Sequence, residues 1–157
     1  MGKYINVIRK FTGKIDWKLI KSLLLLLVGK EYAIKETKEI IKVDKKFVKE
    51  YVSSKYTKGL NSTFKKIKAN LSALIEELIE NASHTKDEDN KEDKHKRDAY
   101  KGWKKFTSRF IIQTYDSKSD KLVMQKYTCV IVVRCPNYKE MYIYDIVNIK
   151  KEADKSQ

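Results

Sequence analysis

The sequence predicts an α+β fold in which N-terminal helices pack on one face of a small antiparallel sheet. Two observations lead to this class. Apolar residues recur at helical spacing up to about residue 81, and from residue 106 onward they alternate or run together as in strands. Helices that precede the strands, rather than alternating with them, are typical of α+β domains.

The first elements can be placed from apolar spacing and turn residues. Apolar side chains at helical intervals predict a helix over residues 15–28, and Gly29 follows where a left-handed residue often ends a helix. Residues 31–43 mix apolar and charged side chains. They predict one or two short strands that turn at residues 36–38.

Two more helices are expected before residue 82. Asp44 is placed as the N-cap of a helix over residues 45–56, whose buried stripe includes Phe47 and Tyr51. The clearest helix runs from residue 62 to about residue 81, because seven apolar side chains share one of its faces. They are Phe64, Ile67, Leu71, Leu74, Ile75, Leu78 and Ala82, and those from Leu71 to Leu78 are expected to pack on the sheet.

The second half of the chain changes character. Residues 83–98 contain no apolar side chain apart from the two histidines, so we expect an exposed charged loop. Strands are predicted at residues 106–115, 126–135 and 141–149, and turn residues separate them. Short turns of this kind predict an antiparallel meander of three strands, with a fourth strand supplied from earlier in the chain.

Length and composition indicate one domain over residues 1–157. A chain of 157 residues with 41% hydrophobic content can bury a modest core without disulfides or metals. We expect an N-terminal helical extension over residues 1–30 and a core over residues 31–152.

The charge balance favours a polyanionic partner, most simply RNA or another nucleic acid. Lys and Arg outnumber Asp and Glu by 35 to 21, which gives a net charge of +14. Residues 1–70 carry 18 basic against 6 acidic side chains, and residues 99–157 carry 12 against 6. A Lys-rich composition that places Lys at any solvated position accounts for the same excess.

The long helix carries its charges in the order that its macrodipole disfavours. Lysines occupy its first turns and glutamates its last, at a cost of about 0.3 kcal/mol or more per misplaced charge. One interpretation is that tertiary burial makes this cost tolerable. The functional interpretation is that Lys65, Lys66 and Lys68 face a polyanion.

The cysteines and histidines predict neither a disulfide nor a metal site. Cys129 and Cys135 would lie roughly 20 Å apart in one strand, so they are expected to be free thiols of a reducing compartment. No Cys or His spacing suits a metal, and no cofactor is predicted. The apolar run at residues 23–28 is too short to cross a bilayer. We therefore expect a cytoplasmic protein without a membrane partner.

Several segments carry a resemblance to a known family. The most specific are the turn from Ala99 to Trp103, with the sequence AYKGW, and the C-terminal run from Tyr144 to Glu152, with the sequence YDIVNIKKE. Residues 32–152 resemble a domain found at the ends of large phage and mobile-element proteins, grouped with the barnase, EndoU, colicin and RelE-like nuclease superfamily. The resemblance implies two helices followed by a four-stranded sheet, and a metal-independent endoribonuclease such as a phage-borne or delivered toxin.

The resemblance also implies a catalytic group. Cleaving RNA without a metal needs a base, an acid and cations that stabilise the charged transition state. His95, the one histidine in the matched segments, would act as base or acid near neutral pH. Arg109 and Arg134 would hold the phosphate charge, and Tyr144 would donate the complementary proton.

Further contacts to the nucleic acid are expected from basic and aromatic side chains outside the catalytic group. They are Lys65, Lys66, Lys68, Lys94, Arg97 and Trp103. Three of these lysines are expected to line one basic surface together with the two arginines of the catalytic group, namely Lys65, Lys66, Lys68, Arg109 and Arg134.

Two other functions stay open. The same fold could carry a non-catalytic nucleic-acid-binding module, for example a phage protein that inhibits a host defence system, because phosphate contacts and stacking need no proton transfer. A basic face could instead bind an acidic protein, such as an acidic inhibitor or a host defence protein. In both cases His95 would be an exposed surface residue without a catalytic role, and Trp103 could be a packed core residue at the start of the sheet.

Overall fold

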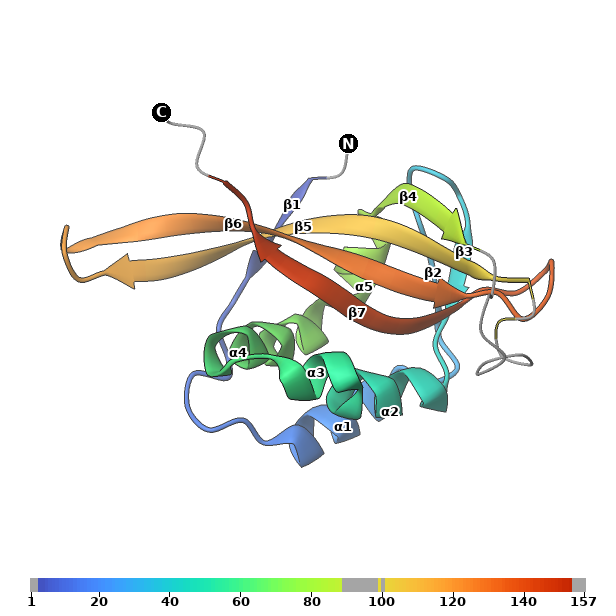
Figure 1. Ribbon diagram of the computed structural model, residues 1–157, viewed down its shortest axis with the longest axis horizontal. Helices are drawn as coiled ribbons and strands as arrows, with labels where there is room; N and C mark the ends of the chain where they lie inside the picture. Colours follow the sequence, from blue (N-terminus) through green and yellow to red (C-terminus); the bar gives the residue numbers. More distant parts are fainter. Residues whose placement is uncertain (1–2, 89–98, 100, 154–157) are drawn as a thin grey trace.

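A computed structural model describes residues 3–88, 99 and 101–153 of the chain. Within these residues the protein forms five α-helices, one 3-10 turn and seven strands, so the predicted α+β class is confirmed. The helices gather beneath one face of a long, curled sheet (Figure 1). No described helix is long and apolar enough to cross a membrane.

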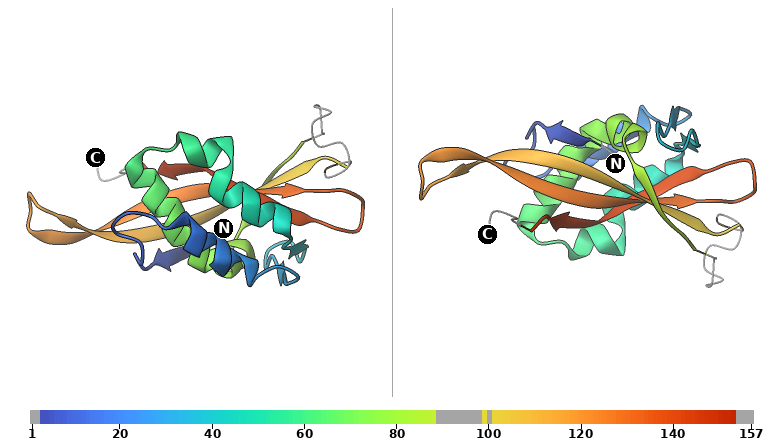
Figure 2. Two further views of the ribbon diagram at one scale, coloured as in Figure 1. Left: turned by 90° about the horizontal axis from the view of Figure 1, so that it is seen from below. Right: turned by 90° about the horizontal axis from the view of Figure 1, so that it is seen from above.

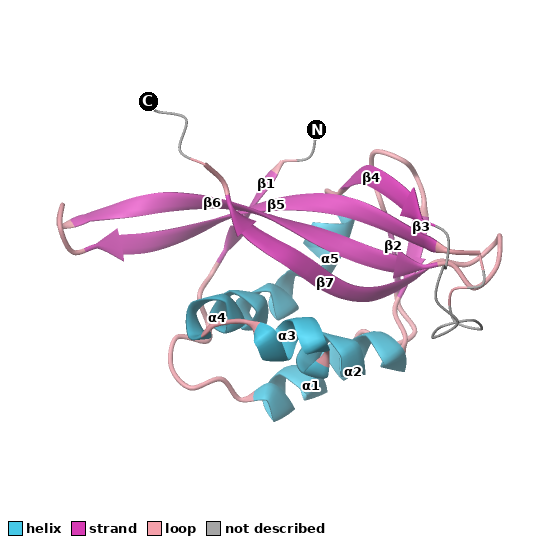
Figure 3. Ribbon diagram, in the orientation of Figure 1, coloured by secondary structure: helices cyan, strands magenta, loops and turns pink. Residues whose placement is uncertain are grey.

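Three long antiparallel strands form the centre of the sheet (Figure 3). They are β5 (Trp103–Asp116), β6 (Lys121–Arg134) and β7 (Tyr142–Lys151), and they confirm the predicted meander. Asp116 closes the turn between β5 and β6, because its carboxylate accepts hydrogen bonds from the Lys118 backbone N–H and the Ser119 hydroxyl. This hairpin projects beyond the helices (Figure 2).

The sheet is larger and more mixed than predicted. Its strand order is β1-β5-β6-β7-β3-β2, and β4 pairs with β5 beside this path. β1 (Tyr4–Val7) runs parallel to β5, β3 (Ile40–Lys42) runs parallel to β7, and β2 (Glu31–Ala33) is antiparallel to β3. The prediction of a small, wholly antiparallel sheet was therefore wrong. Parallel pairs are joined by long connections, which leave no turn signal in the sequence.

Two strands lie where the sequence predicted none. β1 belongs to residues 1–30, which were expected to be only a helical extension. β4 (Ser83–Glu88) belongs to residues 83–98, which were expected to be a loop. Although β4 has no aliphatic side chain, its backbone pairs with the first residues of β5, and the His84 ring packs against Phe106 at 5.5 Å.

All but one of the described α-helices begin at polar caps. Four of them start after a residue whose side chain accepts a hydrogen bond from the backbone N–H three residues further on. The predicted cap Asp44 is among them. These helices are α1 (Trp17–Leu25), α2 (Lys45–Ser53), α3 (Lys55–Gly59) and α4 (Ser62–Leu71), with caps Asp16, Asp44, Ser54 and Asn61.

The helix predicted over residues 62–81 is interrupted. After α4 comes a 3-10 turn, η1 (Ser72–Leu74), and then α5 (Ile75–Glu80). The tighter turn changes the direction of the apolar stripe, so that Leu71, Ile75 and Leu78 are fully buried while Leu74 is only partly buried.

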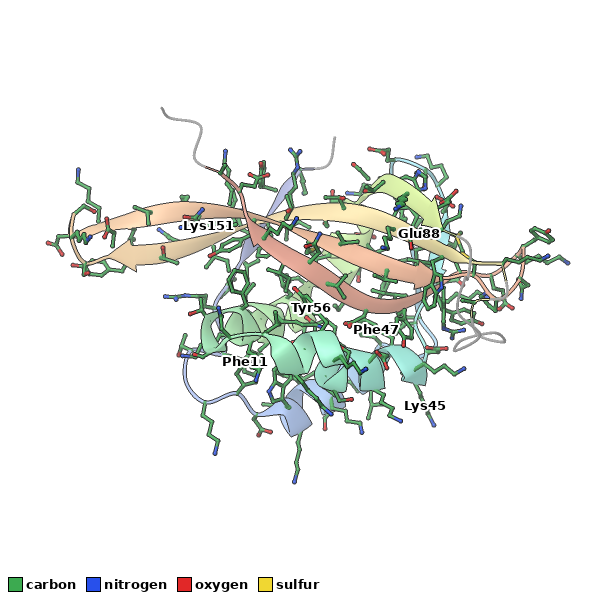
Figure 4. The ribbon with its side chains drawn as sticks, viewed as in Figure 1. Phe11, Lys45, Phe47, Tyr56, Glu88 and Lys151 are labelled. Atoms are coloured by element: carbon green, nitrogen blue, oxygen red, sulfur yellow. The ribbon has the colours of Figure 1, made fainter. Side chains whose placement is uncertain are left out.

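The core lies between the helices and the sheet face above them. Phe47 and Tyr56 lie in this space (Figure 4), and Phe106 and Phe110 of β5 close it from the other side. The Tyr56 hydroxyl accepts a hydrogen bond from the Ile149 backbone N–H at 2.8 Å, which ties α3 to β7. The predicted packing of the helix stripe on the sheet therefore holds for its fully buried members.

Candidate functional site

Side-chain alternation gives the sheet two unlike faces. Phe106, Ser108 and Phe110 of β5 point toward the helices, and the Ser108 hydroxyl donates to the Leu78 carbonyl. The intervening residues point the other way, to a face that no described helix covers (Figures 1 and 2). We call this the outer face, and its side chains include Tyr4, Lys86, Glu88, Trp103, Lys105, Thr107, Arg109, Lys126, Thr128, Val130, Val132, Tyr144, Val147, Lys150 and Glu152.

Two aromatic rings mark one end of the outer face. The rings of Trp103 and Tyr144 meet edge to face, with centroids 5.1 Å apart. Next to them the Glu88 carboxylate lies 3.1 Å from the ammonium groups of both Lys86 and Lys105. Hydrogen bonds from Lys105 and Lys86 lower the pKa of Glu88, so this carboxylate stays charged.

A β-bulge separates the side chains of Tyr144 and Asp145. Val132 of β6 pairs with Asp145 and Val133 pairs with Ile143, so Tyr144 is an extra residue in β7. Tyr144 packs on Trp103, whereas the Asp145 carboxylate accepts hydrogen bonds from Ser54 and Lys68 in the helical layer.

An open pocket of about 590 Å³ lies between the aromatic end of the outer face and helices α2 and α3. Trp103, Tyr144 and Val132 give it an apolar wall. The opposite wall is polar and comes from Glu50, Ser53, Ser54, Lys55 and Tyr56. We call this space the Trp103 pocket.

Three carboxylates line the Trp103 pocket, and they differ in their partners. Glu88 is held by two lysines, and Asp145 by Lys68 and Ser54. Among the described residues, the half-buried Glu50 makes no side-chain hydrogen bond or ion pair. Among the described residues, Glu50 is therefore the pocket carboxylate whose oxygens accept no hydrogen bond from the protein.

Beneath the pocket, Lys68 and Asp145 form a buried ion pair. Their side chains are 0% and 4% exposed, and the Lys68 ammonium also donates to the Thr57 hydroxyl. Burial lowers the pKa of Lys68 and raises that of Asp145, while each group's charge opposes the other's shift. The pair connects α4 to β7 and to the cap of α3.

A third aromatic ring, that of Tyr4, marks the other end of the outer face. Its ring centroid lies 5.0 Å from the Lys126 ammonium and 5.5 Å from the Arg109 guanidinium. The Tyr4 hydroxyl donates to Glu152 at 2.6 Å, and Arg109 lies 4.0 Å from the same carboxylate. The hydrogen bond to Glu152 raises the pKa of Tyr4.

The predicted catalytic side chains are not brought to one point. Trp103, Arg134 and Tyr144 share one end of the sheet, but Arg134 is 6% exposed, lies over the Tyr142 ring and pairs with Asp44. Arg109 is six residues along β5 from Trp103, roughly 20 Å away at the rise of a strand. His95, Lys94 and Arg97 lie outside the described residues.

The predicted basic surface was wrong. Lys68 is buried against Asp145 and cannot meet a polyanion. Lys65 and Lys66 belong to α4, which lies under the sheet (Figure 1), whereas Arg109 points to the outer face beside Tyr4. Lys66 instead lines a smaller pocket of about 230 Å³ with Arg9 and Asn70. These cations therefore lie on unrelated parts of the molecule, and a nucleic-acid surface built from them is excluded.

Sequence reasoning missed Lys68 as a core residue and Glu50, Lys105 and Tyr4 as outer-face or pocket residues. For Lys68 a signal existed, because it lies four residues after Phe64 and three before Leu71, on the apolar side of the helix. For Tyr4 there was none, since only the parallel pairing of β1 with β5 places it beside Arg109.

No group of three or more His, Cys, Asp or Glu side chains in the described part of the chain could hold a metal ion. Comparisons with family models, with curated proteins and with solved structures found no match to this chain.

Proposed function

We propose that the protein binds single-stranded nucleic acid, in the first instance RNA, on its outer face and does not cut it. The observation that carries this proposal is the composition of that face, which no described helix covers. It offers aromatic rings at Trp103 and Tyr144, a third ring at Tyr4, and cations between and beside them.

Stacking and phosphate contacts are what such a face supplies. Bases stack on aromatic side chains whatever their identity, and lysines and arginines follow the phosphates. Five basic side chains of the outer face, Lys86, Lys105, Arg109, Lys126 and Lys150, stand against two acidic ones, Glu88 and Glu152. The net charge of +14 adds a long-range attraction for any polyanion.

We favour binding over cleavage because the described side chains of the predicted catalytic group do not lie within reach of one reacting phosphate. An acid and a base must reach the reacting atoms within hydrogen-bond distance. The Arg134 guanidinium is held by Asp44, and Arg109 pairs with Thr128, which lies six residues along β6 from Arg134, roughly 20 Å away. Cleavage by His95 stays a prediction about residues outside the described part of the chain.

Two neighbouring lysines allow a controlled test of the face. Lys150 pairs with Thr128 on the outer face, whereas Lys151 pairs with Tyr127, so the two exposed side chains point to opposite sides. Binding of labelled single-stranded RNA should weaken as salt rises. Lys150→Gln should lower the log–log salt slope by roughly one unit, and Lys151→Gln should leave it unchanged.

The same reactions decide between binding and cleavage. RNA recovered intact after incubation without metal is the expected result. Products with cyclic-phosphate ends would favour the endoribonuclease. Two results would contradict the outer face as the binding site. One is an RNA affinity that does not change with salt, and the other is an equal decrease of the salt slope in the Lys150→Gln and Lys151→Gln variants.

A further inference from the structure

We infer that the Trp103 pocket binds one unstacked nucleobase that carries an exocyclic amino group, and so selects adenine, cytosine or guanine over uracil. This inference rests on the proposed function, since the base would come from a strand held on the outer face. The pocket opens directly onto that face, because Trp103, Lys105, Val132, Tyr144 and Val147 belong to both.

The size and walls of the pocket suit a base. A volume of about 590 Å³ lies within the range of small-ligand sites and exceeds what one flat heterocycle needs. The apolar wall is built from two aromatic rings set at 72° to each other and from valine side chains. Aromatic walls favour stacking with any base, so they explain capture of a base but not its identity.

The identity follows from the polar wall. A carboxylate only accepts hydrogen bonds. Among the described residues, Glu50 is the lining carboxylate that accepts no hydrogen bond and forms no close ion pair, although its charge acts on the buried Lys68. Adenine, cytosine and guanine each present an amino group that donates. Uracil has no amino group and presents carbonyl oxygens on either side of its single ring N–H. These oxygens are acceptors, so the Glu50 carboxylate would repel them.

The other polar groups fit the same arrangement. Ser53 and Ser54 line the same wall as Glu50. Their hydroxyls donate to the Lys49 carbonyl at 2.7 Å and to Asp145 at 2.9 Å, so both can only accept hydrogen bonds from a ligand. The exposed ammonium of Lys55 lies on the same wall and suits the phosphate attached to the bound base.

The test compares oligo(A), oligo(C) and oligo(U) of about 12 nucleotides, bound to the full chain at one low salt concentration. We expect oligo(A) and oligo(C) to bind about 10-fold more tightly than oligo(U), as one charge-assisted hydrogen bond would provide. Glu50→Gln should reduce the difference to about twofold or less, because an amide both donates and accepts.

Glu76→Gln is the matched control. Glu76 is an exposed residue of α5, outside the pocket, so this variant removes the same charge and should keep the full preference. Equal affinity of the unmodified protein for the three oligonucleotides would overturn the inference and leave the proposed function standing. The same holds if Glu76→Gln loses the preference as fully as Glu50→Gln. If none of the three binds, the proposed function fails as well.

Discussion

The Lys68 ammonium lies 2.7 Å from the Asp145 carboxylate, and both side chains are buried between the helices and β7. The rings of Tyr51 and Tyr56 flank the ammonium at 4.6 and 5.2 Å. This contact holds α4, the cap of α3 and the β7 bulge in one arrangement, and that arrangement forms the floor of the Trp103 pocket.

Removing one partner of this pair should be costly. Lys68→Met leaves Asp145 buried without its counter-charge, and we expect a loss of about 3 to 5 kcal/mol in the free energy of unfolding. Urea unfolding measures the change. Lys65→Met on the same helix should change stability by about 0.5 kcal/mol or less. A Lys68→Met protein as stable as the parent would show that the pair does not hold these elements together.

Burial along the interrupted helix predicts a graded effect of truncation. Leu78→Ala should cost about 2 to 5 kcal/mol, because a fully buried leucine leaves a cavity between α5 and the sheet. Leu74→Ala should cost clearly less, since Leu74 is only partly buried. Denaturant midpoints measured side by side decide the matter. If Leu74→Ala and Leu78→Ala lowered the free energy of unfolding equally, Leu74 would be as buried as Leu78, as in a helix that continues without the 3-10 turn.

Glu140 predicts a loss of stability in acid. Hydrogen bonds from Asn137, Lys42 and Tyr142 lower its pKa to about 2. Its unfolded pKa is about 4.3, so the carboxylate stabilises the fold above that value and the contribution disappears as the pH falls toward 2. Glu140→Gln should therefore lower Tm at pH 7 and leave it nearly unchanged at pH 2. A constant difference across this range would contradict the assignment.

Both cysteines should be unreactive in the folded protein. Cys129 and Cys135 are free and buried, which agrees with the predicted packed thiols, and burial raises the pKa of Cys129 to about 12. Because the thiolate is the reactive form, a disulfide reagent at pH 8 should modify neither thiol until denaturant is added. Cys135→Ser isolates Cys129. Rapid reaction of that single thiol in the native protein would contradict its burial.

The sequence predicted the elements whose signals are local. The cap at Asp44, the helix before Gly29 and the central meander follow from turn residues and periodicity, and the structure contains all three. The sequence did not predict β1 and β4, because one is short and the other is polar. Both form strands by pairing with β5, and no local sequence pattern indicates that pairing. Tertiary pairing overrides local propensity at such edges.

Single residues of the site could be predicted from the sequence, but the long-range contacts between them could not. Trp103 and Tyr144 were selected individually, and the sheet brings them into contact. Lys68 was misplaced because lysine is rarely buried, and its partner Asp145 lies 77 residues away. Arg134 was expected to bind phosphate, but the fold places Asp44, the cap of α2, beside it.

Stacking on Trp103 is the central claim, and tryptophan fluorescence tests it most directly. The chain has two tryptophans, so Trp17→Phe leaves Trp103 as the single emitter. Single-stranded RNA should quench the emission of this variant, and the quenching should weaken as salt rises. Quenching that is seen with Trp103→Phe, where only Trp17 emits, but not with Trp17→Phe would contradict the outer face as the binding site.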